Sequence, residues 1–218
     1  MPATACPTRP RTGRTAQALL AALAALALSL AVAQPGLYGP EAPSDTAWVR
    51  VVNVAAPGGI GVRLADDATV VLPLGGATRY VQVASGDVRV DVGGEPIVVA
   101  VEPETFTTVA ATAAGLVVVT DPALRDASRG LLGLMNLTTH EALDLRVPDG
   151  GRVVAAVPPL AHAALAVARA TSALLVTDGE RVLLRLEPHT FERGVAYVVI
   201  VFDTADGLAA RLLASAAD

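Results

Sequence analysis

Apolar and polar residues alternate along short segments of this chain, and the alternation is clearest at 87–92. There Val88, Val90 and Val92 share one face of an extended segment, and charged residues occupy the positions between them. Because successive side chains of a strand point to opposite faces, this pattern predicts a half-buried strand. Gly93-Gly94, directly after it, predicts a hairpin turn.

Similar short segments, separated by Gly, Pro and Asp turns, recur along the rest of the chain. The expected strands are 48–54, 60–64, 70–72, 79–83, 87–92, 97–101, 105–110, 116–120, 131–137, 142–147, 152–157, 161–168, 173–177, 181–187 and 195–202. Short strands at a spacing of roughly ten residues, with no helical stretch between them, are typical of a β-sandwich or barrel. Two Ala/Leu-rich segments, 161–169 and 208–217, would be helical by propensity alone.

The chain contains one pattern twice. VEPETF at 101–106 returns as LEPHTF at 186–191, and WVRVVNV at 48–54 matches LLGLMNL at 131–137, with Asn53 on Asn136. Because the matches keep their order, we interpret the chain as two copies of one module. The repeat also favours strand over helix at 161–169 and 208–217. We therefore expect an all-β fold with two tandem small antiparallel β-sandwich domains from an internal repeat, after a signal peptide.

The N-terminal segment has the features of an export signal. Arg9, Arg11 and Arg14 precede an almost unbroken Ala/Leu stretch, and Ala31-Val32-Ala33 supplies a small-x-small cleavage pattern. An uncleaved membrane anchor is the alternative, since the apolar stretch approaches the ~18 residues of a candidate span. The expected organisation is a signal peptide at 1–33, an extended arm at 34–47, a first sandwich at 48–122, a linker at 123–129 and a second sandwich at 130–218.

The charge and cysteine content exclude several classes of protein. The chain has 16 basic and 21 acidic residues, and removal of residues 1–33 with their three arginines changes the net charge from −5 to −8. This acidity disfavours nucleic acid and anionic membranes as partners. Cleavage would also remove Cys6, the only cysteine, so the exported protein would contain no disulfide and each sandwich must be stabilised by its own core.

No motif for nucleophilic catalysis or metal binding stands out. The sequence has no Gly-x-Ser-x-Gly elbow and only three histidines, His140, His162 and His189, which we expect to lie at the surface or in turns. His140 with Glu141 and Asp144 is the nearest approach to a metal site, but adjacent residues of a strand point to opposite faces. We therefore expect no catalytic residues, no metal site and no cofactor.

The repeated and aromatic residues have simple structural interpretations. Asn53 and Asn136 end equivalent strands, where an asparagine commonly closes a turn with its own backbone. Phe106 and Phe191 follow the same Glu-Pro-x-Thr motif and are expected to point into the core. Trp48, the only tryptophan, matches Leu131 in the repeat, which favours a core position, yet it follows the arm directly, so a sugar-stacking role stays open.

The run LYGPEAPSDTAWVRVVN at 37–53 resembles the mature N-terminus of the AlgF family of periplasmic alginate O-acetylation proteins. The strand pattern is also similar to small exported β-sandwich domains whose first strand reads Val-Arg-Val-Val-His, but the asparagine and the Tyr-Gly-Pro arm favour AlgF. The family block falls on Leu37, Tyr38, Gly39 and Pro40, and Val49, Arg50, Val51 and Asn53 follow it. The lack of lysine and the acidity depart from the family and leave the identity of the polymer open.

This resemblance implies a non-catalytic periplasmic adaptor required for O-acetylation of an exported polysaccharide. The implied partners are a periplasmic SGNH-type O-acetyltransferase and a membrane-bound acyltransferase, and possible contact with the polysaccharide is left open. The expected partner-binding residues are Leu37, Tyr38, Gly39, Pro40, Trp48, Arg50 and Asn53. The alternatives are a carbohydrate-binding module dependent on Trp48 or Tyr38, and an acetyl-transferring enzyme that uses Ser85, Ser128, Ser172 or a histidine.

Overall fold

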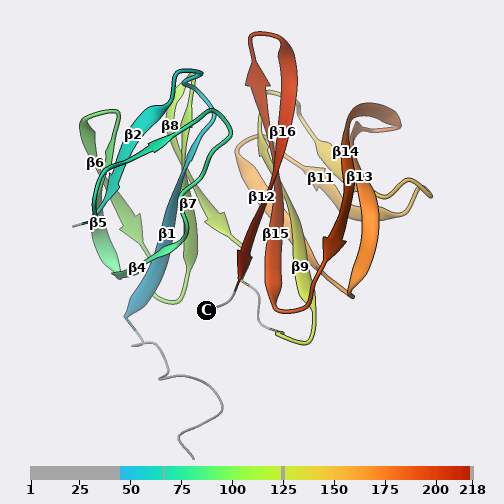
Figure 1. The fold of residues 1–218 in the computed structure, drawn as a ribbon, viewed down its shortest axis with the longest axis horizontal. Coiled ribbons are helices and arrows are strands. Elements are labelled where there is room, and N and C mark those ends of the chain that lie inside the picture. The colour runs from blue at the N-terminus through green and yellow to red at the C-terminus, as the bar shows by residue number, and fades with distance from the viewer. Residues whose placement is uncertain (1–44, 66, 124–125, 217–218) are drawn as a thin grey trace, which may run out of the picture. The chain divides into compact units, whose positions relative to one another are not determined.

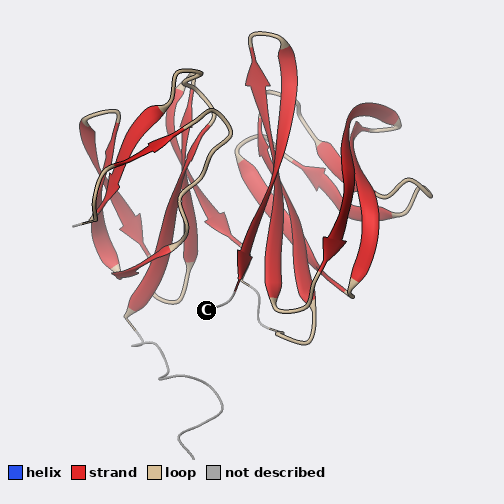
Figure 2. Cartoon of the chain, in the orientation of Figure 1, coloured by secondary structure: helices blue, strands red, loops and turns tan. Residues whose placement is uncertain are grey.

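Sixteen strands and no helix make up the part of the chain that the structure describes (Figures 1 and 2). The structure is a computed structural model that describes residues 45–65, 67–123 and 126–216, all within one unit of the chain, 43–218. In these ranges no helix is long and apolar enough to cross a membrane. The expected signal peptide and the residues Leu37 to Pro40 lie outside the described residues.

The first eight strands form two four-stranded sheets, which we call the N-terminal sandwich. Their bounds are β1 Thr46–Asn53, β2 Ile60–Leu64, β3 Val70–Leu72, β4 Val81–Ala84, β5 Gly86–Val92, β6 Glu95–Val101, β7 Phe106–Thr112 and β8 Gly115–Asp121. The strand orders are β4-β1-β7-β8 and β3-β2-β5-β6. Val88, Val90 and Val92 are buried as their alternation predicted, and Gly93 and Gly94 form the β5–β6 turn.

The remaining eight strands form the C-terminal sandwich in the same arrangement. Their bounds are β9 Gly130–Leu137, β10 Leu143–Arg146, β11 Arg152–Val157, β12 Ala161–Val167, β13 Ala170–Asp178, β14 Arg181–Phe191, β15 Val195–Thr204 and β16 Gly207–Ala216. The strand orders, β12-β9-β15-β16 and β11-β10-β13-β14, match those of the N-terminal sandwich strand for strand. The all-β fold of two tandem sandwiches from an internal repeat is therefore confirmed.

The two segments with helical propensity are strands. β12 pairs with β9 along its whole length, and β16 pairs with β15 over ten consecutive residue pairs. Their alanines and leucines lie against neighbouring strands, so tertiary pairing outweighs the weak intrinsic preference of these residues for helix. The repeat predicted this outcome correctly where local composition did not.

Each sandwich has its own aliphatic core between its two sheets. In the N-terminal sandwich the core includes Val49, Val51, Val62, Val90 and Val109, each at most 1% exposed. The core of the C-terminal sandwich contains more leucine, with Leu134, Leu143, Leu145 and Leu174, and also buries the aromatic side chains of Phe191 and Tyr197.

Each sandwich contains one parallel strand pair, and the register of this pair determines which side chains lie next to each other on the outer face. β1 runs parallel to β7, and β9 runs parallel to β15, whereas the other pairings are antiparallel. Trp48 is the registered partner of Phe106, and Arg50 is that of Thr108. Since Val49 and Val51 face the core, the alternation of β1 puts Trp48, Arg50 and Val52 on the outer face.

A third apolar cluster joins the outer faces of the two sandwiches. Val52, Ala110 and Val119 of the N-terminal sandwich pack with Met135, Leu137, Val198, Ile200 and Phe202 of the C-terminal one. Each of these side chains is at most 6% exposed. The sheet β4-β1-β7-β8 therefore has both faces covered over part of its area.

The Glu-Pro-x-Thr-Phe motif has different structures in the two copies. In the first copy it forms the turn before β7, with Glu104 at a positive φ of 57° and its N–H bonded to Thr46 O. In the second copy the same residues continue β14 as far as Phe191. By strand register the equivalent of Phe106 is Ala196, five residues beyond Phe191. The motif match located the repeat but did not give its register in this region.

Candidate functional site

The carboxylate of Asp121, at the end of β8, is the centre of a buried polar cluster. Asp121 Oδ1 lies 2.7 Å from His162 Nδ1 and 3.7 Å from an Arg50 terminal nitrogen, and Oδ2 accepts a 2.6 Å bond from the Tyr80 hydroxyl and one from Thr108 Oγ1. Four of these residues belong to the N-terminal sandwich and His162 belongs to β12 of the C-terminal one. The cluster therefore joins the two sandwiches through hydrogen bonds beside their apolar contact.

The charges of this cluster are compensated by one another. The side chains of Arg50 and Asp121 are 3% and 2% exposed, and Arg50 Nε donates to Thr108 Oγ1 at 2.7 Å. Burial alone would raise the pKa of the Asp121 carboxyl, but the His162 hydrogen bond and the Arg50 charge hold it below its usual value. Burial also raises the pKa of the Tyr80 hydroxyl, which keeps it a neutral donor. Asp121 is therefore an ionised acceptor.

His162 is the one histidine that the expectation of surface or turn positions got wrong. Its side chain is 5% exposed, and its Nδ1 carries the proton of the bond to Asp121, because a carboxylate only accepts. Its Nε2 is buried without a hydrogen-bond partner among the described residues. A Cβ at Gly133 of β9 would overlap this Nε2, so glycine at that position makes room for the ring. The pair has the Asp–His arrangement of a catalytic dyad, but no hydroxyl lies at Nε2 to be activated.

Three aromatic rings gather beside the buried cluster. Trp48 stacks on Phe106 with centroids 4.7 Å apart and planes at 8°, and Tyr80 meets Phe106 edge-on at 5.1 Å. The Arg50 guanidinium lies 4.6 Å from the Tyr80 ring centre, a cation–π contact. The expected core position is confirmed for Phe191 but wrong for Phe106. Phe106 is half-buried on the outer face, because its register partner is Trp48, which lies on that face.

A groove of about 610 Å³ opens over these rings, and we call it the Trp48 groove. The N-terminal sandwich contributes the three rings with Arg50, Arg79 and Gln82, and the C-terminal sandwich contributes Ala196 and residues 213–215. Of the expected partner-binding residues, the structure brings Trp48 and Arg50 together here. Because the groove combines three aromatic rings with two arginines and a glutamine, we take it as the candidate functional site.

Asn53 lies away from the groove and is fully buried. Its Nδ2 donates to Ala56 O and Leu72 O at 3.0 and 2.9 Å, and its Oδ1 accepts from the N–H groups of Ala55 and Ala56. Asn136 does the same in the second copy, donating to His140 O and Val157 O. The predicted turn-closing geometry is present at both positions. Leu37, Tyr38, Gly39 and Pro40 lie outside the described residues, and partner binding by the whole set stays a prediction.

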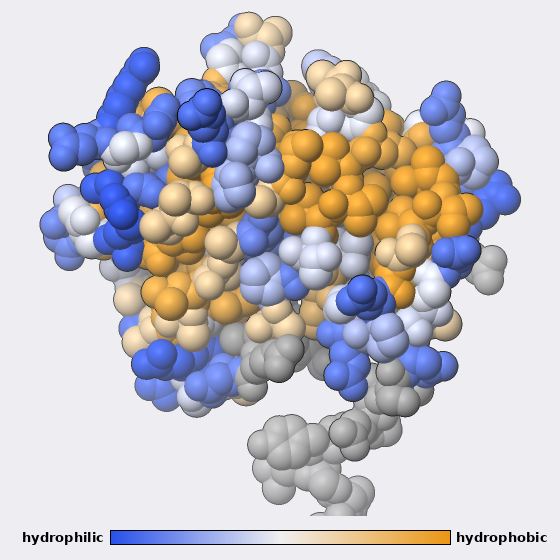
Figure 3. Space-filling view, turned by 180° about the vertical axis from the view of Figure 1, so that it is seen from behind, coloured by the Kyte–Doolittle hydropathy of each residue, from blue (hydrophilic) through white to orange (hydrophobic). Residues whose placement is uncertain are grey.

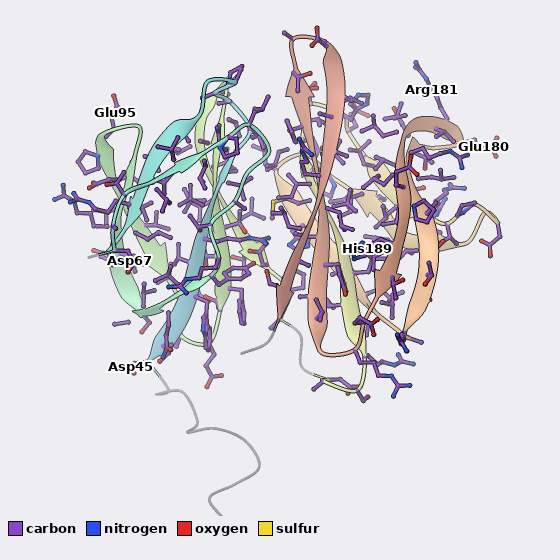
Figure 4. The ribbon with its side chains drawn as sticks, in the orientation of Figure 1. Asp45, Asp67, Glu95, Glu180, Arg181 and His189 are labelled. Atoms are coloured by element: carbon purple, nitrogen blue, oxygen red, sulfur yellow. The ribbon has the colours of Figure 1, made fainter. Side chains whose placement is uncertain are left out.

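The other candidate chemical groups lie apart from one another. His140 is 3.4 Å from Asp178, and His189, labelled in Figure 4, is exposed on β14 beside Phe191 and Tyr197. Ser128 bonds Asp126, and Ser172 bonds the Ala173 carbonyl. Among the described residues no group of three His, Cys, Asp or Glu side chains could hold a metal ion. Asp144, part of the weak metal candidate, instead pairs with Arg146 and Arg152.

Sequence reasoning missed Asp121, Tyr80, Thr108 and Gly133. Asp121 precedes Pro122 at the end of the expected first sandwich, where an Asp-Pro pair is typical of a turn, and no local signal marks the other three. His162, a lone polar residue inside an Ala-rich strand, was the available signal, because such a residue implies a buried hydrogen-bond partner.

The described surface also carries apolar side chains outside the groove. Figure 3 shows apolar residues gathered on the face seen from behind. Among exposed large apolar side chains, Leu116 and Val118 belong to β8, Leu165 to β12 and Val98 to β6. These four side chains belong to three different sheets, and none of them lines the Trp48 groove.

Comparison with known proteins gives one family. The model of the family described as "Alginate O-acetyl transferase AlgF" matches residues 18–198. The alginate biosynthesis protein AlgF of Pseudomonas aeruginosa is 29% identical over 195 residues, which cover 84% of this chain and 87% of the relative. AlgF of Pseudomonas syringae pv. tomato is 26% identical over 194 residues, covering 88% and 86%. A solved structure of the C-terminal domain of P. aeruginosa AlgF aligns with a TM-score of 0.37 at 26% identity, covering 40% of this chain and 98% of that domain.

Proposed function

Because this chain belongs to the AlgF family of alginate O-acetylation, we propose that it is a non-catalytic periplasmic adaptor. In this role it holds an SGNH-type O-acetyltransferase and a membrane-bound acyltransferase together during acetylation of an exported polysaccharide. The N-terminal sequence, with its basic region, apolar stretch and Ala-Val-Ala site, supports export.

The geometry of His162 carries the non-catalytic part of this proposal. An acyl-transfer enzyme needs a nucleophile within hydrogen-bond reach of its base. Here the Nε2 of the Asp121–His162 pair faces Gly133 and has no partner among the described residues. Both side chains are at most 5% exposed, so the pair offers almost no surface to a substrate. The pair serves to hold the sandwiches together.

The adaptor part of the proposal is supported by unpaired strand edges. Each sandwich has four edge strands, because each of its two sheets is open and has an outermost strand on either side. Edge strands keep a row of unpaired backbone N–H and C=O groups to which an extended segment of a partner can add. A protein with two such sandwiches can present edges to two partners at once.

Co-purification tests this proposal. The chain 34–218 is expected to retain the periplasmic O-acetyltransferases of its own organism, and a second form lacking 34–44 tests the arm. The deletion stops at 44 because Thr46 and Ala47 belong to β1 and are buried. Loss of the complex with the arm would locate the contact within residues 34–44, which include Leu37 to Pro40. Failure of both forms to retain any O-acetyltransferase would refute the adaptor role.

A carbohydrate-binding module is the second candidate, and the Trp48 groove is the observation that favours it. Aromatic rings stack on sugar faces, and guanidinium groups bind carboxylates. This candidate expects the isolated chain to be retained by an acidic polysaccharide in a manner that depends on Trp48. Retention that survives Trp48→Ala would remove it.

A further inference from the structure

Two unpaired strand edges, one from each sandwich, border the Trp48 groove. β4 ends its sheet and pairs only with β1, and β16 ends its sheet and pairs only with β15. Gln82 of β4 and Leu213, Ala214 and Ser215 of β16 all line the groove. The strands are labelled in Figure 1. The groove therefore offers backbone donors and acceptors along its borders as well as side chains on its floor.

A polypeptide in an extended conformation matches such a border better than a sugar does. A segment that adds to an edge bonds alternate backbone groups along its length, and its side chains then point alternately into and out of the groove. β16 contributes three consecutive residues, Leu213 to Ser215, to the groove border, and β4 contributes only Gln82. The longer edge gives an added strand more backbone bonds, so β16 is the better acceptor of the two.

The charge of the groove differs from that of the chain as a whole. Its lining includes Arg50 and Arg79 and no acidic residue, although the chain has 21 acidic and 16 basic residues. Glu95, the first residue of β6, and Glu180, in the β13–β14 turn, lie elsewhere (Figure 4), whereas Asp67 lines a second recess together with Arg79. Arg79 is exposed, whereas Arg50 is buried and already faces Asp121. The available cation at the rim is thus Arg79, and it favours a partner that carries carboxylates.

The groove also concentrates the aromatic residues of an aromatic-poor chain. Of seven aromatic residues, three line this one recess. Rings held rigid by stacking are the side chains that most often anchor a binding partner, because they bury large apolar area at little entropic cost. An apolar side chain of an added strand would rest on Trp48 and Phe106.

We propose that the Trp48 groove binds an extended, acidic segment of a partner protein, which adds to β16 as a further strand. Its carboxylates lie at Arg79 and its inward apolar side chains rest on the rings. This inference rests on the adaptor function proposed above, and it specifies the face of the adaptor and the chemistry of the partner segment.

The test uses the chain 34–218 and an O-acetyltransferase that co-purifies with it. Synthetic peptides without tryptophan that tile the sequence of this acetyltransferase are titrated into the chain, and the emission of Trp48, the only tryptophan, is followed. A peptide with alternating acidic or apolar residues is expected to shift this emission. Arg79→Glu is expected to weaken binding of that peptide by about tenfold or more, because it places a like charge opposite the carboxylates of the peptide. Arg181→Glu, an exposed arginine at the β13–β14 turn (Figure 4), makes the same charge change away from the groove and is expected to leave binding unchanged.

The outcomes separate this inference from the adaptor function. A complex that forms equally well with Arg79→Glu, with no peptide shifting the Trp48 emission, overturns the groove assignment and leaves the adaptor standing. Absence of any complex refutes the adaptor and the inference together. If acidic oligouronates shift the Trp48 emission and the peptides do not, the occupant is a saccharide and the peptide assignment is wrong.

Discussion

The two sandwiches share one strand order but present opposite chemistry on their outer faces. Strand register shows which positions of the two copies are equivalent. Trp48, Arg50, Phe106, Thr108 and Asp121 of the first copy correspond to Leu131, Gly133, Ala196, Val198 and Ser215 of the second. The first set consists mainly of bulky or polar side chains, and the second set is smaller and contains only one polar residue, Ser215. At these five positions the first copy therefore presents a protruding face and the second copy a receding one. In the apolar cluster between the sandwiches the sizes are reversed, with Val52 and Ala110 of the first copy beside Met135 and Ile200 of the second.

Together these differences make the two outer faces complementary in size. Two identical bulky faces would clash, whereas a large side chain opposite a small one fills space at native density. His162 is the exception on the receding face, and it is the residue that satisfies Asp121. The repeat thus keeps the fold constant while the outer faces become complementary. Five substitutions and one measurement of pH dependence test this comparison, in order of the size of the expected effect.

Asp121→Asn should have the largest effect on the protruding face. The buried Arg50 guanidinium loses its compensating charge and His162 loses its acceptor. Removing one partner of a buried ion pair costs about 3 to 5 kcal/mol of unfolding free energy. Urea denaturation of the chain 34–218 measures this cost. Asp91→Asn is the matched control, because Asp91 pairs with Arg63 and Arg89 on an exposed hairpin, and it should change the stability far less.

The acid dependence of stability gives an independent check on Asp121. Although burial alone would raise the pKa of this carboxyl, its hydrogen bond to His162 and the charge of Arg50 keep the folded pKa below the unfolded value. Its stabilisation is therefore complete above the unfolded pKa, about 4, and is lost as the pH falls through the folded pKa. Asp121→Asn should flatten the loss of unfolding free energy below about pH 4. An unchanged slope would mean that the carboxylate is not held ionised by this cluster.

Asn53→Ala and Asn136→Ala should have equal effects, because these residues are alike in both copies. Each asparagine joins the end of the first strand of its copy to the end of the third, through Leu72 O or Val157 O. Each deletion leaves buried carbonyl and N–H groups unpaired, at a cost of about 2 to 3 kcal/mol. Thermal or urea unfolding of the two variants measures both costs. A difference of more than about 1 kcal/mol would show that the repeat does not preserve this turn energetically.

The strands could be predicted from the sequence because their information is local or repeated. The alternation at 87–92 specified β5, and the repeat correctly assigned β12 and β16 as strands although alanine and leucine favour helix. The register of the Glu-Pro-x-Thr-Phe motif could not be predicted in the same way. Whether Phe106 faces in or out depends on where β7 begins relative to β1, and this is a non-local pairing.

The buried cluster could not be predicted because it forms between the two modules. The sequence indicated Arg50 through the resemblance to the family and Trp48 as the only tryptophan, and both line the groove. Asp121 and His162 are 41 residues apart in the sequence, on strands of different sandwiches. A polar residue inside a buried strand requires a hydrogen-bond partner, but nothing in the sequence specified that Asp121 and His162 would be partners of each other. A single chain without register information leaves that pairing open.

Gly133→Ala tests the receding face and should have a smaller effect. The added Cβ would overlap His162 Nε2 and crowd the Ala163 carbonyl at 3.1 Å. Overpacking of this size costs about 1 to 2 kcal/mol. His162→Ala should relieve part of the cost, so a double-mutant cycle should give a coupling energy between the two positions. Gly61→Ala is the control, since its Cβ would meet only Thr69 Cγ2 at an ordinary 3.7 Å. Additive effects at 133 and 162 would contradict the assigned contact.

Trp48→Leu, which gives the first copy the residue of the second, should have the smallest effect on stability. Trp48 is half-buried and stacks on Phe106 rather than lying between the sheets. Loss of one aromatic pair costs about 1 kcal/mol, and Trp48→Phe, which keeps a ring on Phe106, should cost less. Calorimetry or circular dichroism on heating measures the difference. A loss comparable to that of Asp121→Asn would place Trp48 in the structural core. A small loss would mean that tryptophan at this position contributes little to folding, and that its contribution is to the groove that distinguishes the first copy from the second.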